Sequence, residues 1–272
     1  LAKNGYKIII PHNNQANEAK LRLLGTTGQI IPVRFRSLKE KKLINLINKA
    51  DIILNLKTVW DEKKISYAKG ILDFNIELVN CVNINKPFIF FSGIGIDKNT
   101  NSKRSHAINK SEKYILENLN NAIILRPGII IGGEDNFLKA LLPLFKTSFF
   151  IPLFGNGLSK FQPVFVDDVS IAVNKIIKNN LWDKNIYELI GPNVFTYKEF
   201  YNFLASCMNK TRVLVPIPIN IVKIAVSILE KTPISPLNSE QLKLFCSDNI
   251  ASNNKNLYDL GIKPQDLKEI IK

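Results

Sequence analysis

Two kinds of segment alternate along the first half of the chain. Short runs that are apolar throughout are typical of strands buried on both faces of a parallel sheet; they span residues 7–11, 29–33, 51–56, 87–92 and 122–125. Segments with the spacing or end signals of helices lie between them; they span residues 18–24, 37–49, 64–82 and 105–119. Ser37 is expected to cap the second helix. This alternation predicts an α/β fold with a doubly wound, Rossmann-type parallel sheet.

The pattern becomes less regular after residue 132. A helix at residues 135–145 and a strand at 163–166 are followed by mixed short elements, among them a strand at 186–190 and an apolar amphipathic stretch at 219–229. We therefore predict a nucleotide-binding Rossmann-type domain at residues 1–185. Residues 186–272 are predicted to form a small mixed α/β cap that packs on the first domain and is interleaved with it.

The first residues look like the end of an element whose beginning is not in the sequence. Leu1 to Gly5 resembles the last turn of a helix stopped by glycine, but no helix start precedes it. No Gly-x-Gly-x-x-Gly pattern occurs in the chain. We therefore expect the first strand and phosphate loop of a dinucleotide fold to be absent from this chain, which we interpret as a fragment.

Composition excludes several classes of protein. With 272 residues, 46% hydrophobic and 22% charged, the chain is neither disordered nor a coiled coil. Three cysteines without short spacing indicate no disulfide framework and no zinc knuckle, and only two histidines exclude a His-rich metal site, so no metal is expected. No apolar run reaches the roughly 18 residues needed to span a bilayer.

The chain is basic, with a formal net charge of +14 from 37 Lys and Arg against 23 Asp and Glu. Lysines account for 31 of the 37, whereas proteins that read phosphates or bases rely more on arginine, so no nucleic acid is expected. Residues 1–185 carry +12 of the charge. A solvated basic surface explains this excess, and a surface that faces a membrane or a partner is the alternative.

Ligands of doubly wound sheets bind at the carboxyl ends of the strands, which makes strand ends the candidate site. His12 and Asn13 follow the first strand, where a dinucleotide fold meets the adenosine ribose. The chain offers there neither the carboxylate that favours NAD nor the arginine that accepts the 2′-phosphate of NADP. An ordinary polar turn is the alternative interpretation of both residues.

Further candidates end the later strands. Asn55 and Leu56 end one strand, and Ser92 ends another, before a Gly-Ile-Gly turn. His106 and Lys110 are four residues apart and share one helical face. A serine, a titratable ring and a lysine in this order resemble a Ser-Tyr-Lys hydride-transfer site, in which the ring exchanges a proton with the substrate. A solvated helix face is the alternative for Lys110, and a turn for Asn55.

Pro127, Gly128 and Ile129 end the strand at residues 122–125. A glycine at this point suits a backbone pressed against a flat ring, whereas a simple turn is the competing interpretation. Because Ser92 and Gly128 end consecutive strands, they are expected to lie on neighbouring strand ends.

Several stretches together resemble one family. They are residues 24–33 (LGTTGQIIPV), 53–56 (ILNL), 90–92 (FFS), 124–128 (ILRPG), 132–135 (GGED), 161–169 (FQPVFVDDV), 187–192 (YELIGP) and 247–249 (SDN). The chain resembles the atypical or extended short-chain dehydrogenase/reductases, in particular the NAD(P)H-binding accessory subunits of respiratory complex I and their bacterial relatives. The family's Tyr-x-x-x-Lys becomes His106-x-x-x-Lys110 here, and its arginine after the second strand becomes Asn13.

The resemblance implies a protein that binds NADP or NAD as a structural ligand and has an accessory or assembly role beside the subunits of complex I. It implies a peripheral position on the cytoplasmic face of a bacterial inner membrane, or on the matrix side in mitochondria, and contact with the membrane surface is a further expectation. The alternative is an active NAD(P)-dependent reductase, dehydratase or epimerase on a small carbonyl or nucleotide-sugar substrate, with His106 or Ser92 as proton donor.

Overall fold

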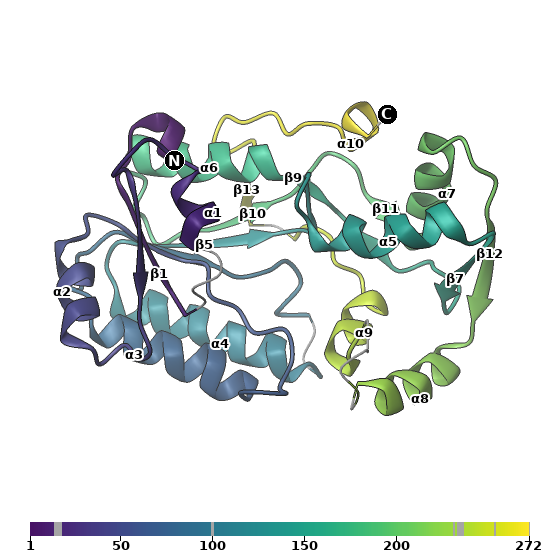
Figure 1. Cartoon of the computed structure of the whole chain (residues 1–272), viewed down its shortest axis with the longest axis horizontal. Helices are drawn as coiled ribbons and strands as arrows, with labels where there is room; N and C mark the ends of the chain where they lie inside the picture. Colours follow the sequence, from purple (N-terminus) through teal and green to yellow (C-terminus); the bar gives the residue numbers. More distant parts are fainter. Residues whose placement is uncertain (14–17, 99–100, 231, 233–236, 253, 272) are drawn as a thin grey trace.

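A five-stranded parallel sheet forms the centre of the molecule (Figure 1). The computed structural model describes residues 1–13, 18–98, 101–230, 232, 237–252 and 254–271. In spatial order the strands are β13 (Lys255–Asn256), β10 (Ile186–Leu189), β5 (Ala122–Pro127), β4 (Phe88–Phe91) and β3 (Ile53–Asn55). All four pairings are parallel, so the predicted parallel α/β fold is confirmed.

The first two strands form a sheet of their own. β1 (Ile8–His12) pairs in parallel with β2 (Ile30–Arg34), with Ile8 opposite Ile30 and His12 opposite Arg34. In the described part of the chain neither strand pairs with β3. The strands that the sequence placed in one sheet therefore lie in two sheets.

Helices cover both faces of the central sheet. One face packs on α2 (Lys41–Lys49), η3 (Ala68–Asp73, a π-helical stretch), α3 (Phe74–Asn80) and α4 (Lys103–Asn118), and the other on α6 (Val166–Lys178) (Figure 1). Successive residues of β4 alternate between these two cores, with Phe88 and Phe90 in one and Ile89 in the other. All three are fully buried, which explains why the strand is apolar throughout.

Two helix starts differ from the sequence prediction. α2 begins at Lys41 and not at Ser37, because the Glu40 carboxylate accepts hydrogen bonds from the Arg36 and Ser37 amides and holds that segment as a turn. α4 begins at Lys103, since the Ser102 hydroxyl caps it by accepting from the amide of Ser105.

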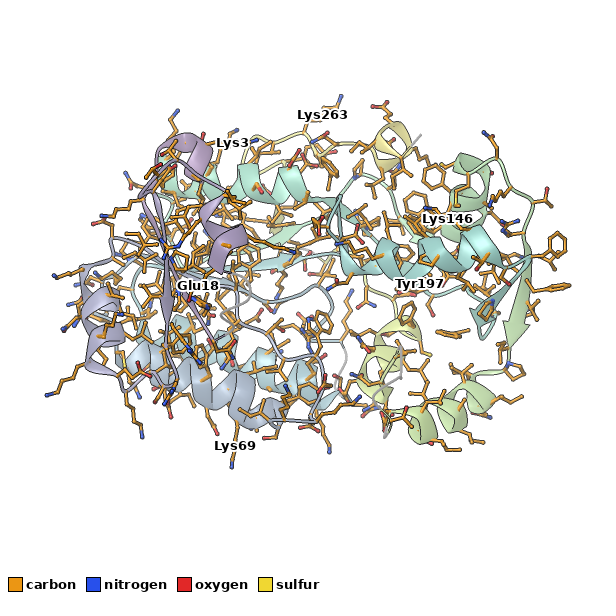
Figure 2. All side chains as sticks on the ribbon, viewed as in Figure 1. Lys3, Glu18, Lys69, Lys146, Tyr197 and Lys263 are labelled. Atoms are coloured by element: carbon orange, nitrogen blue, oxygen red, sulfur yellow. The ribbon has the colours of Figure 1, made fainter. Side chains whose placement is uncertain are left out.

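A second lobe lies beside the sheet and holds most of the remaining elements (Figures 1 and 2). They are α5 (Asn136–Thr147), β7 (Phe150–Phe154), β8 (Lys160–Phe161), β11 (Phe195–Thr196), α7 (Tyr197–Cys207), β12 (Val213–Ile217), α8 (Ile219–Leu229) and α9 (Ser239–Phe245). Its core is aromatic, and Phe161 stacks on Tyr197 at 4.7 Å between ring centroids.

The two parts interleave along the chain. The sequence placed residues 186–190 in the cap, but β10 and β13 complete the central sheet, whereas α5 and β7, before residue 185, belong to the second lobe. The short elements η1 (Ala2–Asn4), α1 (Glu18–Arg22), β6 (Ile130–Ile131), β9 (Val164–Phe165) and α10 (Leu267–Ile270) complete the described chain. No described helix combines the length and apolar character that crossing a membrane requires.

Candidate functional site

Ser92 and Pro127 lie side by side at the carboxyl edge of the central sheet. The Ser92 amide donates to the Leu125 carbonyl at 2.8 Å, and the Ile94 amide donates to the Pro127 carbonyl at 3.1 Å. The Ser92 Oγ is buried and has no hydrogen-bond partner among the described residues. Since an unsatisfied buried hydroxyl costs about 1–3 kcal/mol, this atom fits a hydrogen bond to a ligand at the strand ends.

Asn55 is fully engaged within the protein. Its Nδ2 donates to the Oδ1 of Asn75 on α3 at 2.6 Å, and its Oδ1 accepts from the Lys57 amide at 3.0 Å. The amide therefore fixes the end of β3 against α3. Leu56, the next residue, has 60% of its surface exposed and offers an apolar contact at the same strand end.

Gly128 is required by the protein itself. Its amide donates to the Leu189 carbonyl at 2.9 Å, and a Cβ at this position would lie 2.0 Å from the Gln162 carbonyl oxygen. The predicted close approach at this glycine is thus made by the segment around Gln162. Ile129 is half-buried and packs against the core of the second lobe, so the end of β5 leads from one lobe to the other.

The ends of β1 and β2 carry a charged site that sequence reasoning missed. His12 Nε2 lies 3.1 Å from a Glu18 carboxylate oxygen, and Asn13 is exposed in the bend that follows. Arg34, opposite His12 on β2, lines an open cavity of about 330 Å³ with Phe35, Arg36 and Glu40. The signal for this site was two arginines, two residues apart, at a strand end.

His106 and Lys110 project from the exposed side of α4. They line a cavity of about 260 Å³ whose other walls are Glu62 and Tyr67 before η3, Ala68 and Leu72 of η3, and Lys103 and Ala107 of α4. The structure thus brings His106 and Lys110 together, as their helical spacing predicted. Ser92 does not line this cavity, and no hydrogen bond joins Ser92 to His106 among the described residues.

Arg126, the residue before the candidate Pro127 in β5, has structural partners. Its guanidinium makes two bonds to the Glu112 carboxylate of α4, at 2.9 and 2.7 Å, and one to Asp97 at 2.9 Å. Burial alone would lower the pKa of Arg126, but the bonds from Glu112 and Asp97 outweigh burial and raise it. The charged arginine therefore fixes α4 to the end of β5 and is not free to hold a ligand.

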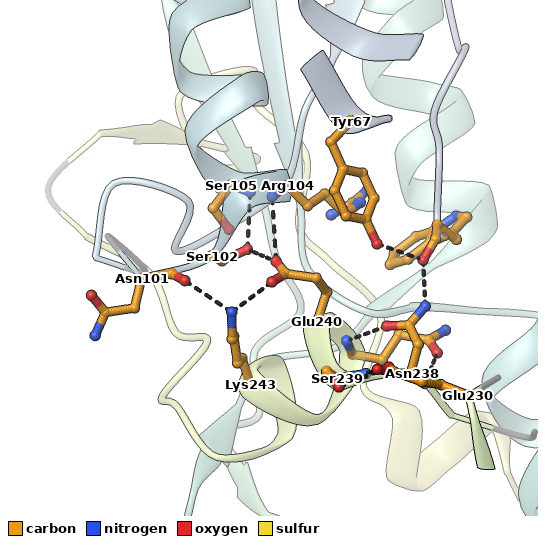
Figure 3. A network of polar contacts seen from close by, with 12 residues as sticks. Tyr67, Asn101, Ser102, Arg104, Ser105, Glu230, Asn238, Ser239, Glu240 and Lys243 are labelled. Atoms are coloured by element: carbon orange, nitrogen blue, oxygen red, sulfur yellow. Dashed lines mark hydrogen bonds and ion pairs between the residues drawn. The ribbon is translucent and has the colours of Figure 1, made fainter. Parts of the chain in front are cut away.

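A polar network joins the second lobe to the sheet domain (Figure 3). Glu240 of α9 accepts from the Ser102 hydroxyl at 2.5 Å and from the Arg104 amide at 3.3 Å, at the start of α4. Lys243 donates to Glu240 at 2.6 Å and to the Asn101 carbonyl at 2.9 Å. Burial tends to raise the pKa of Glu240, but the bonds from Lys243, Ser102 and Arg104 lower it below its ordinary value.

The same network orders the loop that follows β3. The Arg104 guanidinium lies 3.9 Å from the ring centre of Trp60 and donates to the Val59 carbonyl and the Thr58 hydroxyl. Burial lowers the pKa of Arg104 to about 10. Burial, and then the nearby Glu240, raises the pKa of Tyr67 to about 12, and the Tyr67 hydroxyl donates to the Trp60 carbonyl at 3.1 Å. Both groups therefore keep their protonated forms at neutral pH.

Known proteins similar to this chain are subunits of NADH dehydrogenase. The chain is 28% identical to the "NADH dehydrogenase [ubiquinone] 1 alpha subcomplex subunit 9, mitochondrial" of Arabidopsis thaliana, over 98% of this chain and 71% of that protein. It is 25% identical to the "NADH-ubiquinone oxidoreductase 40 kDa subunit, mitochondrial" of Neurospora crassa, over 98% of this chain and 72% of that protein. No family model matches the chain.

Solved structures with the same fold include epimerase-type proteins. A nucleoside-diphosphate-sugar epimerase of Staphylococcus aureus superposes with a TM-score of 0.70 at 14% identity, covering 97% of this chain and 89% of that one. The human epimerase family protein SDR39U1 with NADPH superposes with a TM-score of 0.65 at 14% identity, covering 97% of both chains. The predicted resemblance and the Rossmann-type fold are confirmed.

Proposed function

We propose, from the premise that the chain is an atypical short-chain dehydrogenase/reductase related to the alpha subcomplex subunit 9 proteins, that it is an accessory or assembly subunit of respiratory complex I with a structural nicotinamide nucleotide. The observation that carries this proposal is the similarity to those subunits over 98% of the chain, together with a fold shared with nucleotide-binding proteins. The position proposed is peripheral, on the cytoplasmic face of a bacterial inner membrane or the matrix side of a mitochondrial one.

The nucleotide is proposed to lie across the carboxyl edge of the central sheet. The Ser92 hydroxyl, which lacks a partner among the described residues, would bond the nucleotide there. Leu56 would supply an apolar contact, and Pro127 would form the floor between β4 and β5. A bound nicotinamide nucleotide can supply or accept a hydride, but the residues named here bind and orient it.

A structural role for the nucleotide is favoured over catalysis. Catalysis requires a proton donor within reach of the substrate, and the Ser92 hydroxyl would have to act together with that donor. His106 and Lys110 line a cavity with residues beside η3, and Ser92 is not part of it. The chain also has an imidazole where its relatives' motif has a phenol, and the two groups differ in reach and in ordinary pKa. An active reductase, dehydratase or epimerase remains the alternative, and turnover distinguishes the two.

The choice between NADP and NAD is proposed to depend on Arg34 and Arg36. Asn13 is neutral, and His12 faces Glu18, so the first strand end supplies no permanent positive charge. Arg34 lies directly opposite His12, and Arg36 shares its open cavity. Two guanidinium groups suit a dianionic phosphate, so we propose a preference for the NADP form.

Nucleotide-dependent stabilisation of the purified protein tests the proposal. NADPH at 100 times its Kd should raise the unfolding free energy by about 2.7 kcal/mol, seen as a higher Tm. Ser92→Ala should weaken NADPH binding about tenfold, whereas Ser170→Ala, a control at an exposed position of α6, should not. Arg34→Ser with Arg36→Ser should weaken NADPH about tenfold or more and leave NADH unchanged.

Two results would contradict the proposal. If neither NADPH nor NADH stabilised the protein, the proposed structural nucleotide would be ruled out. Turnover of a carbonyl or nucleotide-sugar substrate that His106→Ala abolishes would establish the enzymatic alternative. Association is tested separately, by whether complex I subunits co-purify with the tagged protein from membranes solubilised in mild detergent.

A further inference from the structure

One face of helix α8 is apolar and uncovered. Ile221, Ile224, Ala225 and Ile228 follow the spacing of a single helical face, and all four are exposed; Ile224 and Ile228 each expose 63% of their surface. We call these four residues the α8 apolar face. Exposed aliphatic residues are ordinary when they are scattered, but a continuous stripe along a helix indicates a surface that something else covers.

The opposite side of α8 is firmly attached to the second lobe. Val222 and Val226 are buried and pack with Leu242 of α9 and with Phe154 and Ile217 at the ends of β7 and β12. The helix therefore already has a core contact, and the α8 apolar face is a second apolar surface on the same helix.

The polar residues of α8 occupy a narrow flank. Asn220, Lys223 and Ser227 follow one another at spacings of three and four and are separated from the α8 apolar face on the helix surface. The exposed Lys223 therefore places one cation on α8, beside the α8 apolar face and not within it.

The two strands before α8 are apolar on their outer side as well. β7 and β12 pair in parallel, with Phe150 opposite Val213 and Pro152 opposite Val215. Phe150, Val213 and Val215 are all exposed, and the exposed Phe149 contacts Phe150 edge-on at 5.2 Å between ring centroids. The exposed apolar residues of β12 thus lead along the chain to the α8 apolar face, and the exposed rings of Phe149 and Phe150 belong to the segment that pairs with β12.

The segments that carry these apolar residues have few acidic side chains to balance their basic ones. Residues 145–160 and 205–232 contain six Lys and Arg and one Glu, a larger imbalance than the 37 to 23 of the whole chain. Lys210 donates to the Lys146 carbonyl and Arg212 to the Phe145 carbonyl, which gathers three cations at the end of α5, where Figure 2 labels Lys146. These cations complement an anionic surface.

We infer that the α8 apolar face, with Phe149 and Phe150, inserts into the interfacial region of a bilayer that contains anionic lipids. This inference rests on the peripheral position proposed above and names the surface responsible for it. A bilayer with anionic lipids is favoured over a protein partner because lysines accompany both apolar surfaces, Lys223 on α8 and Lys146 and Lys210 beside the aromatic pair, whereas lysine is depleted in protein interfaces. Lys146, Lys210 and Arg212 at the end of α5, next to Phe149 and Val213, and the exposed Lys223 on α8 add attraction to anionic headgroups.

Flotation of the full purified protein with lipid vesicles tests this inference. We expect binding to vesicles of phosphatidylcholine mixed with phosphatidylglycerol, and weaker binding to vesicles of phosphatidylcholine alone. The triple variant Ile221→Gln, Ile224→Gln, Ile228→Gln should lose at least about tenfold in partitioning to both. The control changes three apolar residues exposed elsewhere; it is Leu23→Gln, Ile84→Gln, Val194→Gln, and it should bind as the parent protein does.

The charge contribution is tested with lysine variants. Lys146→Gln, Lys210→Gln and Lys223→Gln should each weaken binding to the anionic vesicles by up to about fivefold and leave binding to phosphatidylcholine unchanged. Added salt should reduce the binding of the parent protein to anionic vesicles in the same way. The control Lys69→Gln, on η3, should leave binding to either kind of vesicle unchanged.

Three outcomes would overturn the inference. The parent protein could fail to float with anionic vesicles at low salt, or the triple variant could float as well as its control. The triple variant could instead lose co-purification with complex I subunits while the parent protein binds no vesicles, which would make the surface a protein interface. NADPH stabilisation and co-purification of the parent protein are measured independently, so failure of the proposed function is recognised separately.

Discussion

The sheet domain and the second lobe differ in how completely they bury their apolar residues. In β4 and β5 of the sheet domain, Phe90 and Ile124 are buried on one face of the sheet and Ile89 on the other, each by helices. In the second lobe, α8 and the β7–β12 pair each bury one side only and expose Ile, Val and Phe on the other. The first domain completes its own core, whereas the second lobe keeps an apolar surface for a contact outside this chain.

The two regions also differ in how their polar groups are used. Buried polar groups in the sheet domain hold elements together, as Arg126 does with Glu112, and Asn55 with Asn75. Lys223 on α8 is exposed and lies beside apolar residues. Mutations in the first region should therefore change stability, and mutations in the second should change binding.

The largest loss of stability is expected from Glu112→Ala. This change leaves the buried Arg126 without its bidentate partner, and breaking a buried pair in this way costs about 3–5 kcal/mol. Urea denaturation measures the difference. Glu134→Gln, which removes a pair with Lys139 that is exposed to solvent, is the control and should leave the unfolding free energy unchanged. If Glu112→Ala lowered the unfolding free energy by less than about 1 kcal/mol, the buried charge of Arg126 would not need Glu112 for its stabilisation.

The next largest effect is expected at Gly128. The added Cβ of Gly128→Ala would collide with the Gln162 carbonyl oxygen, and relieving such overpacking costs about 1–3 kcal/mol. Gly133→Ala is the matched control, because a Cβ at Gly133 meets no atom within 4 Å. Equal midpoints of thermal unfolding for the two variants would mean that the end of β5 can move away from Gln162.

The sequence predicted the sheet domain better than the site. Runs that were apolar throughout gave the parallel strands correctly, because residues buried on two faces need no polar alternation. The neighbouring ends of β4 and β5 followed from strand order, which placed Ser92 beside Pro127. The separation of β1 and β2 from the central sheet was not predicted, because an apolar run indicates a strand but not the strand with which it pairs.

The polar partners of the candidate residues depend on contacts distant in sequence. Asn55 is held by Asn75, twenty residues away, and the space at Gly128 is filled by Gln162. A local pattern cannot show either partner, so both residues looked free to contact a ligand. Glu240 is likewise separated from Ser102 by 138 residues, and no local sequence pattern indicates the network between the lobes.

The network between the lobes should depend on pH. Because the folded protein lowers the pKa of Glu240 from its ordinary value of 4.5, its contribution is fully present above that value and is lost as the pH falls through the lowered pKa. At neutral pH, Glu240→Gln should lower the unfolding free energy by about 1 kcal/mol, because it weakens the bonds to Ser102 and Lys243. Thermal unfolding of the two proteins should converge at acidic pH. If the difference in stability between the parent protein and Glu240→Gln stayed constant from neutral to acidic pH, a group other than Glu240 would account for the stabilisation.

The smallest effect on stability is expected on the α8 apolar face. Ile224 is largely exposed, so Ile224→Gln should change the unfolding free energy by no more than about 0.5 kcal/mol. Val226→Ala, two residues further along the same helix, removes buried methyl groups and should cost about 1–3 kcal/mol. The denaturant midpoints of the two variants compare the stability contributed by the exposed side and the buried side of α8. A loss at Ile224 as large as that at Val226 would mean that the isolated chain covers this face itself, and the contrast between the two lobes would then disappear.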